Sequence, residues 1–101
     1  MNDCRMEFGF NEERIIEDGD YSLEEVWRML EETMNRQHLS ASLKGVYEGD
    51  YETSFSDFIY SVARLSNEIW FRKYCNKWLF TNPEDGDDDV YQHMVDRGII
   101  L

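Results

Sequence analysis

The chain has few of the residues that would cross-link it, interrupt it or anchor it in a membrane. Its 101 residues include two cysteines, Cys4 and Cys75, and one proline, Pro83. Two cysteines outside any Cys-x-x-Cys pair exclude a disulfide-rich scaffold and favour a cytoplasmic protein with reduced thiols. No apolar run approaches the roughly 20 residues that span a bilayer, and the first residues do not resemble a signal peptide. We therefore expect one soluble domain over residues 1–101, without membrane contact.

Basic residues are also scarce. Ten Lys and Arg face 22 Asp and Glu, which gives a formal net charge of −12. Affinity for nucleic acids and for anionic membranes comes from Lys and Arg, so this balance argues against direct binding of either. A basic protein surface is the partner that the charge favours. Plain solubility is the alternative explanation.

The negative charge is concentrated towards the two ends of the chain. Residues 1–32 hold eleven acids and three bases, and residues 83–101 hold six acids and one base. Residues 33–82 hold five acids and six bases, and they carry ten of the 15 aromatic residues. This distribution predicts a core-forming centre with an acidic segment on either side.

Apolar spacing predicts a mainly α-helical, compact domain of three to four helices. The clearest helix is expected at about residues 22–38, where Ser22 and Glu25 form a capping box ahead of an apolar stripe. A helix over about residues 67–82 would place Trp70, Tyr74 and Trp78 in one row, for which core packing is the commoner explanation. Further helices are expected from Ser54 and after the acidic run at 84–89, and a short helical turn is expected at about residues 11–19.

Two segments favour extended structure instead. Met6, Phe8 and Phe10 alternate with Glu7 and Gly9, as in a half-buried strand at about residues 5–10. Residues 39–52 alternate in the same way and contain two glycines, which fits a short hairpin or a structured loop equally well. The helical domain is therefore expected to include at most a short β-hairpin or strand pair, formed by these two segments.

The sequence lacks the motifs of catalysis and of metal binding. Of the three acidic positions that precede the glycine of a calcium-binding EF-hand loop, only one is filled before Gly19, by Asp18, and only one before Gly86, by Asp85, so neither loop matches. The two cysteines and two histidines are scattered and do not form a zinc-binding pair. There is no nucleophile elbow, phosphate-binding glycine loop or HExxH motif. We expect no enzyme activity, metal or cofactor; a loose calcium site in residues 84–89 is the alternative to a solvated charge run.

The acidic surfaces are then the best functional signal. Carboxylates on one helix face recur about every 5.4 Å, and each strand of duplex DNA carries a charge about every 3.4 Å. A rigid acidic helix with an acidic loop can therefore approximate the field of a nucleic acid. The expected partner-binding residues form two patches: Glu24, Glu25, Glu31 and Glu32 in the first, and Glu84, Asp85, Asp87, Asp88 and Asp89 in the second.

In size and charge the chain is similar to the nucleic-acid-mimicking inhibitors of phages and mobile elements, such as anti-CRISPR and anti-restriction proteins. The resemblance transfers no residues. It implies an inhibitor that blocks the basic channel of a nuclease or another nucleic-acid-binding protein. One alternative is an immunity protein or antitoxin that neutralises a basic toxin. Another is a structural or adaptor domain that uses the aromatic face of residues 70–80.

Overall fold

The structure is a computed structural model that describes residues 3–100. Within these residues, five strands form one antiparallel sheet and five helices accompany it. The strands are β1 (Cys4–Phe10), β2 (Ala41–Leu43), β3 (Val46–Gly49), β4 (Cys75–Asn82) and β5 (Gly86–Asp89). The helices are α1 (Glu12–Asp18), α2 (Leu23–Arg36), α3 (Tyr51–Ser66), α4 (Ile69–Tyr74) and α5 (Val90–Asp96).

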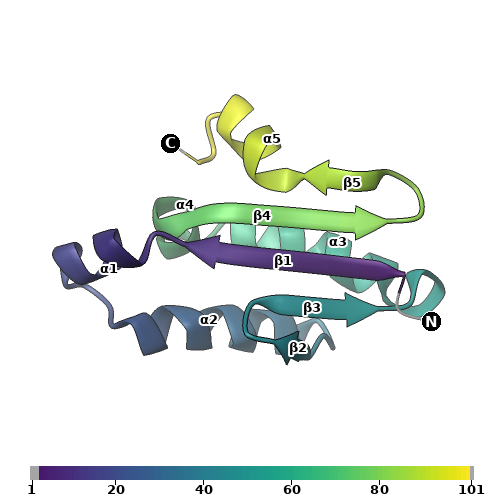
Figure 1. Cartoon of the computed structure of the whole chain (residues 1–101), viewed down its shortest axis with the longest axis horizontal. Helices are drawn as coiled ribbons and strands as arrows, with labels where there is room; N and C mark the ends of the chain where they lie inside the picture. Colours follow the sequence, from purple (N-terminus) through teal and green to yellow (C-terminus); the bar gives the residue numbers. More distant parts are fainter. Residues whose placement is uncertain (1–2, 101) are drawn as a thin grey trace.

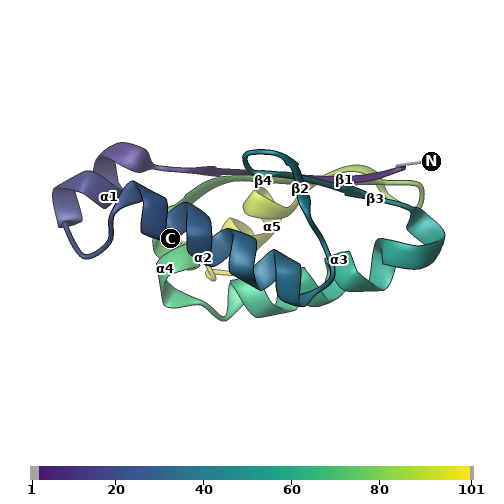
Figure 2. The ribbon, with the colours of Figure 1, turned by 90° about the horizontal axis from the view of Figure 1, so that it is seen from below.

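The sheet has β1 at its centre and the strand order β2-β3-β1-β4-β5 (Figure 1). On one side of β1, Met6 lies opposite Tyr47 of β3, and on the other side Phe8 lies opposite Trp78 of β4. Helices α2, α3, α4 and α5 lie on one side of the sheet (Figure 2). The other face of the sheet is left uncovered, and it is the face that Figure 1 shows.

The core fills the space between the sheet and the helices. Alternate residues of β1, from Cys4 to Phe10, are buried against it, as the polar–apolar alternation predicts. Trp78 of β4 is fully buried; its ring centroid lies 4.8 Å from that of Phe71 and 6.0 Å from that of Phe8. Such aromatic contacts between α4, β1 and β4 hold the centre of the sheet to the helical layer.

The prediction of a mainly α-helical domain of three to four helices is wrong, because the protein is a mixed α/β sheet structure. The helix expected over residues 67–82 ends at Tyr74, and the chain continues as β4. The row at Trp70, Tyr74 and Trp78 has a spacing of four, which suits a helix face but is also even. An even spacing equally places side chains on one face of a strand, and Phe80 continues that face. The acidic run at 84–89, expected as a loop, likewise contains β5.

The predictions for the two extended segments and for the start of the first long helix are confirmed. The strand at residues 5–10 is β1, and residues 39–52 contain the β2–β3 hairpin rather than an irregular loop. The Ser22–Glu25 capping box is present at the start of α2. Gly45 turns the hairpin with a φ of 78°, a conformation that favours glycine.

The two thiols are free and buried. Cys75 lies opposite Phe10, six residues along β1 from Cys4, which separates the two cysteines by about 20 Å. A disulfide needs Cα atoms closer than about 7 Å, so these two cysteines cannot pair within one folded chain. Within residues 3–100, no helix has both the length and the apolar character to cross a membrane.

Candidate functional site

The two predicted acidic patches lie at opposite edges of the molecule. Helix α2, with the first patch, runs along the edge formed by β2 and β3 (Figure 1). The second patch belongs to the β4–β5 hairpin at the other edge of the sheet. The structure therefore brings residues together within each patch, but it does not bring the two patches together.

The first patch occupies the outer face of α2. Val26, Leu30 and Met34 are fully buried on the inner face, and this fixes the orientation of the helix. The side chain of Glu25 is used in the capping box, where it accepts a hydrogen bond from the Ser22 amide at 3.2 Å. The three remaining carboxylates of the patch are exposed and make no hydrogen bond or ion pair within the described part of the chain; they are Glu24, Glu31 and Glu32.

Two cations stand beside these carboxylates. Glu24, Arg28, Glu31 and Lys44 surround a hollow of ≈ 340 Å³ next to the ring of Trp27. The ammonium of Lys44 lies 4.8 Å from the centroid of that ring, a cation–π contact. Arg28 forms no ion pair with any residue between positions 3 and 100. This surface is therefore predominantly acidic, but it is not uniformly so.

The carboxylates of the second patch are mostly engaged within the fold. Their oxygens accept hydrogen bonds from two side-chain hydroxyls and from the first turn of α5, and one carboxylate pairs with a histidine. The contacts are Glu84 with the Tyr51 hydroxyl at 2.7 Å, Asp87 with the Thr81 hydroxyl at 3.0 Å, Asp88 with His93 at 2.8 Å and Asp89 with the Gln92 amide at 3.1 Å. The carboxylate of Asp85 has no such contact within residues 3–100.

The position of β5 also gives its charge a structural explanation. It is an edge strand, and an exposed strand edge is prone to pair with another chain. Three successive aspartates, Asp87 to Asp89, discourage that pairing by mutual repulsion. The second patch is thus explained in part by contacts within the fold, whereas Glu24, Glu31 and Glu32 make no such contact within residues 3–100.

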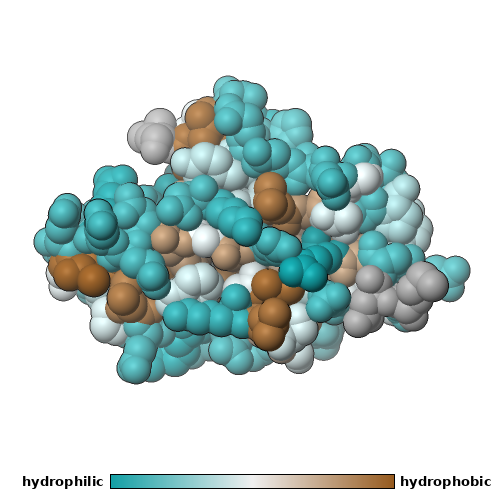
Figure 3. All heavy atoms as spheres, viewed as in Figure 1, coloured by the Kyte–Doolittle hydropathy of each residue, from teal (hydrophilic) through white to brown (hydrophobic). Residues whose placement is uncertain are grey.

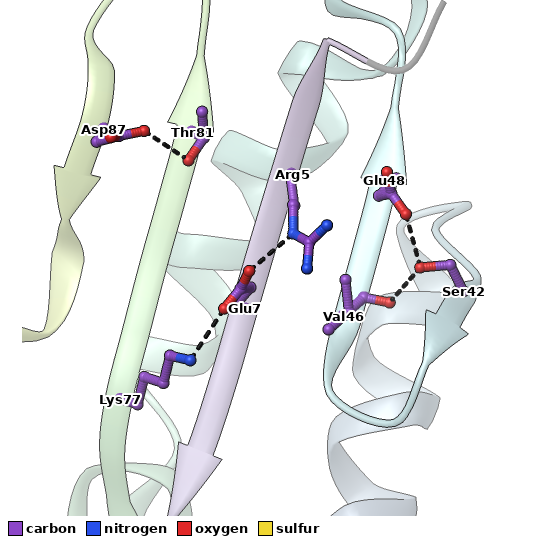
Figure 4. A network of polar contacts seen from close by, with 8 residues as sticks. All are labelled: Arg5, Glu7, Ser42, Val46, Glu48, Lys77, Thr81 and Asp87. Atoms are coloured by element: carbon purple, nitrogen blue, oxygen red, sulfur yellow. Dashed lines mark hydrogen bonds and ion pairs between the residues drawn. The ribbon is translucent and has the colours of Figure 1, made fainter.

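Sequence reasoning missed the uncovered face of the sheet, because it did not predict a sheet. Across this face, Glu7 of β1 accepts hydrogen bonds from Arg5 at 2.7 Å and pairs with Lys77 of β4 at 2.9 Å (Figure 4). The hydrogen bond from Lys77, followed by that from Arg5, lowers the pKa of the Glu7 carboxyl. The sequence signal that could have revealed this face is the set of polar residues that alternate with the buried residues of β1. The surface in this view is mostly hydrophilic, with small and separate hydrophobic patches (Figure 3).

The predicted aromatic row lies in the core rather than on a surface. Trp70, Tyr74 and Trp78 are all buried, so the expectation of core packing is confirmed. These rings offer no exposed aromatic face for a partner. Among residues 3–100, no group of three or more His, Cys, Asp and Glu side chains is placed to hold a metal ion.

Comparison of the chain with protein-family models and with curated proteins finds no match. The candidate interface therefore stands on geometry and charge alone. Its strongest element is the outer face of α2, where a helix presents exposed carboxylates that make no hydrogen bond or ion pair within residues 3–100.

Proposed function

We propose that this protein is a non-catalytic, acidic inhibitor that occupies the basic channel of a nuclease or another nucleic-acid-binding protein in place of its nucleic acid. The observation that carries the proposal is the set of exposed, unpartnered carboxylates Glu24, Glu31 and Glu32 on α2. Charge of one sign repels itself and lowers stability, and these side chains make no hydrogen bond or ion pair within residues 3–100 that would offset the repulsion. A basic partner would neutralise them.

The outer face of α2 is well suited to imitate a phosphate backbone. Glu24 and Glu31 are seven residues apart, which corresponds to a rise of about 10.5 Å along the helix, or about three phosphate spacings of one DNA strand. The buried inner face holds α2 in place before binding. A pre-organised surface of this kind loses little conformational entropy when the complex forms.

The two acidic edges favour a channel over a flat surface as the binding partner. Four strand spacings of about 4.8 Å separate β2 from β5, so the sheet edges lie about 19 Å apart. A flat basic surface could reach one edge at a time, whereas a channel with two basic walls could contact both. In such a channel, Asp85 and the free oxygens of β5 would add a second contact to that of α2.

The second candidate function is that of an immunity protein or antitoxin in the cytoplasm, which neutralises one basic toxin. It is favoured by the same asymmetry between the patches. Within residues 3–100, most carboxylates on α2 have no partner and most on the β4–β5 hairpin have one, so a partner protein that contacts a single edge would use the α2 surface. This candidate predicts one cognate partner, whose gene lies beside the gene for this protein.

The test is capture from a bacterial lysate at low salt, followed by elution with duplex DNA or RNA. We expect the competitor to release a nucleic-acid enzyme, and we expect cleavage by that enzyme to fall when this protein is added. The variant Glu31→Gln/Glu32→Gln should capture less, while Glu52→Gln/Glu68→Gln, which removes the same charge from exposed positions on α3 and before α4, should capture normally. The proposal would be contradicted if the captured proteins are not released by nucleic acid and remain bound at high salt.

A further inference from the structure

One hollow of this acidic protein is lined by cations and apolar side chains. It lies at the end of the molecule where α1, α4 and the segment after α5 meet (Figure 1). Its volume is ≈ 320 Å³, within the range of small-ligand sites. No acidic residue lines it among residues 3–100; the lining consists of Arg14, Ile69, Arg72, Lys73, Gly98 and Ile99.

The three cations differ in how far they are already neutralised. Lys73 pairs with Asp18 at 3.1 Å and with Asp20 at 3.8 Å. Arg14 lies 3.9 Å from Asp18 and donates to the Lys73 carbonyl at 3.4 Å. Arg72 has no ion pair in the described part of the chain. Arg72 is therefore the cation that remains available to a ligand.

The side chain of Arg72 is also held in place. Its Nε donates a hydrogen bond to the carbonyl of Ser66 at 2.7 Å. This bond leaves the two terminal nitrogens of the guanidinium without a partner within residues 3–100. A guanidinium fixed in this way offers a pair of parallel N–H donors, which matches the two oxygens of a carboxylate.

The apolar lining of the hollow includes Ile69, which precedes Arg72 by three residues on α4 and so lies on the same helix face. Ile69 is 77% exposed, the largest exposed fraction among the large hydrophobic side chains that the structure describes. Ile99, in the segment after α5, is partly buried and lines the same hollow. A single exposed isoleucine is common on protein surfaces. Because Ile69 shares a helix face with Arg72, which has no ion pair within residues 3–100, the hollow combines apolar and cationic groups.

We propose that this hollow binds a monocarboxylate that carries a short aliphatic chain. The carboxylate accepts hydrogen bonds from the terminal nitrogens of Arg72, and the aliphatic chain lies against Ile69 and Ile99. Three cations and the two aspartates paired with them leave about one positive charge, which suits a monoanion. A phosphate dianion would be repelled by Asp18 and Asp20. The carboxylate belongs to a free organic acid or to the last residue of a polypeptide.

The site is independent of the proposed inhibition, since neither acidic patch contributes to it. The test is an NMR titration of the full-length protein with hexanoate, which represents a free acid, and with N-acetyl-leucine, which represents a polypeptide end. Both should shift the Arg72 side-chain signal and the Ile69 signals, and the tighter of the two identifies the source. Uncharged 1-hexanol should bind more weakly than hexanoate.

The variant Arg72→Gln should weaken binding of the tighter acid about tenfold, because it removes the charge-assisted hydrogen bonds. Arg36→Gln removes an exposed arginine from the last turn of α2, far from the hollow, and should bind normally. Ile69→Ser, at a site too exposed to disturb folding, should weaken hexanoate but not acetate. Equal affinity in the two arginine variants, equal binding of hexanol, or no shift at Arg72 and Ile69 with either acid would overturn the proposal.

Discussion

Replacing Trp78 and its neighbour Leu79 separately with alanine tests whether residues 75–82 form a strand rather than the helix that the sequence predicts. In β4 the two side chains point to opposite faces of the sheet: Trp78 is 0% exposed in the core, and Leu79 is 36% exposed on the uncovered face. Removing a buried tryptophan typically costs about 3–5 kcal/mol of unfolding free energy. The indole also donates to the Met6 sulfur at 3.4 Å. Removing a surface leucine should cost less than about 1 kcal/mol.

The costs are measured by urea denaturation, with far-UV circular dichroism as the signal. The two variants must have comparable m-values, so that the comparison reports stability alone. If Trp78→Ala does not fold, Trp78→Phe is the milder variant, with an expected cost of about 1.5 kcal/mol. A helix over these residues would put both side chains on its apolar side and make the two costs similar. Costs that agree within about 0.5 kcal/mol, or a larger cost at Leu79, would therefore refute the strand assignment.

Three further predictions follow from single contacts. The hydroxyl of Tyr74 donates to Asp18 and lowers the pKa of that carboxyl, so this contact stabilises the fold above about pH 4 and is lost as the pH falls through the folded pKa. In thermal melts, Asp18→Asn should therefore lose less stability than the wild type between about pH 5 and pH 2. A Cβ on Gly45, where φ is 78°, would lie 2.9 Å from the Trp27 ring, so Gly45→Ala should lower the free energy of unfolding by more than about 1 kcal/mol. Burial raises the pKa of the Cys75 thiol to about 12, so a thiol reagent should modify it only as fast as the protein opens.

The elements that could be predicted from the sequence are those specified by near neighbours. The Asn11 cap and Gly19 stop of α1, and the Ser22 cap of α2, each depend on residues within one or two helical turns. The sheet depends on pairs that are distant along the chain, such as Phe8 opposite Trp78. Strand β5 has no apolar alternation at all and is formed by pairing with β4, which local periodicity does not encode.

The candidate site was also predictable only where it depends on residues that are close together in the sequence. The outward direction of Glu24, Glu31 and Glu32 follows from helix periodicity, and the structure agrees with it. The engagement of the hairpin carboxylates was not predictable, because partners such as Tyr51 for Glu84 come from other elements. The separation of the two patches could not be foreseen either, since it depends on the strand order of an unpredicted sheet.

The most direct test of the proposed function is the association rate with the nucleic-acid-binding protein recovered by capture. The measurement compares Glu31→Lys/Glu32→Lys on α2 with Glu52→Lys/Glu68→Lys elsewhere, which changes the net charge by the same amount. We predict that the α2 reversal slows association at least about tenfold more than the control at low salt, and that the difference shrinks as salt is added. Equal rates for the two variants, or the recovery of no such partner, would contradict the proposal that α2 is the recognition surface.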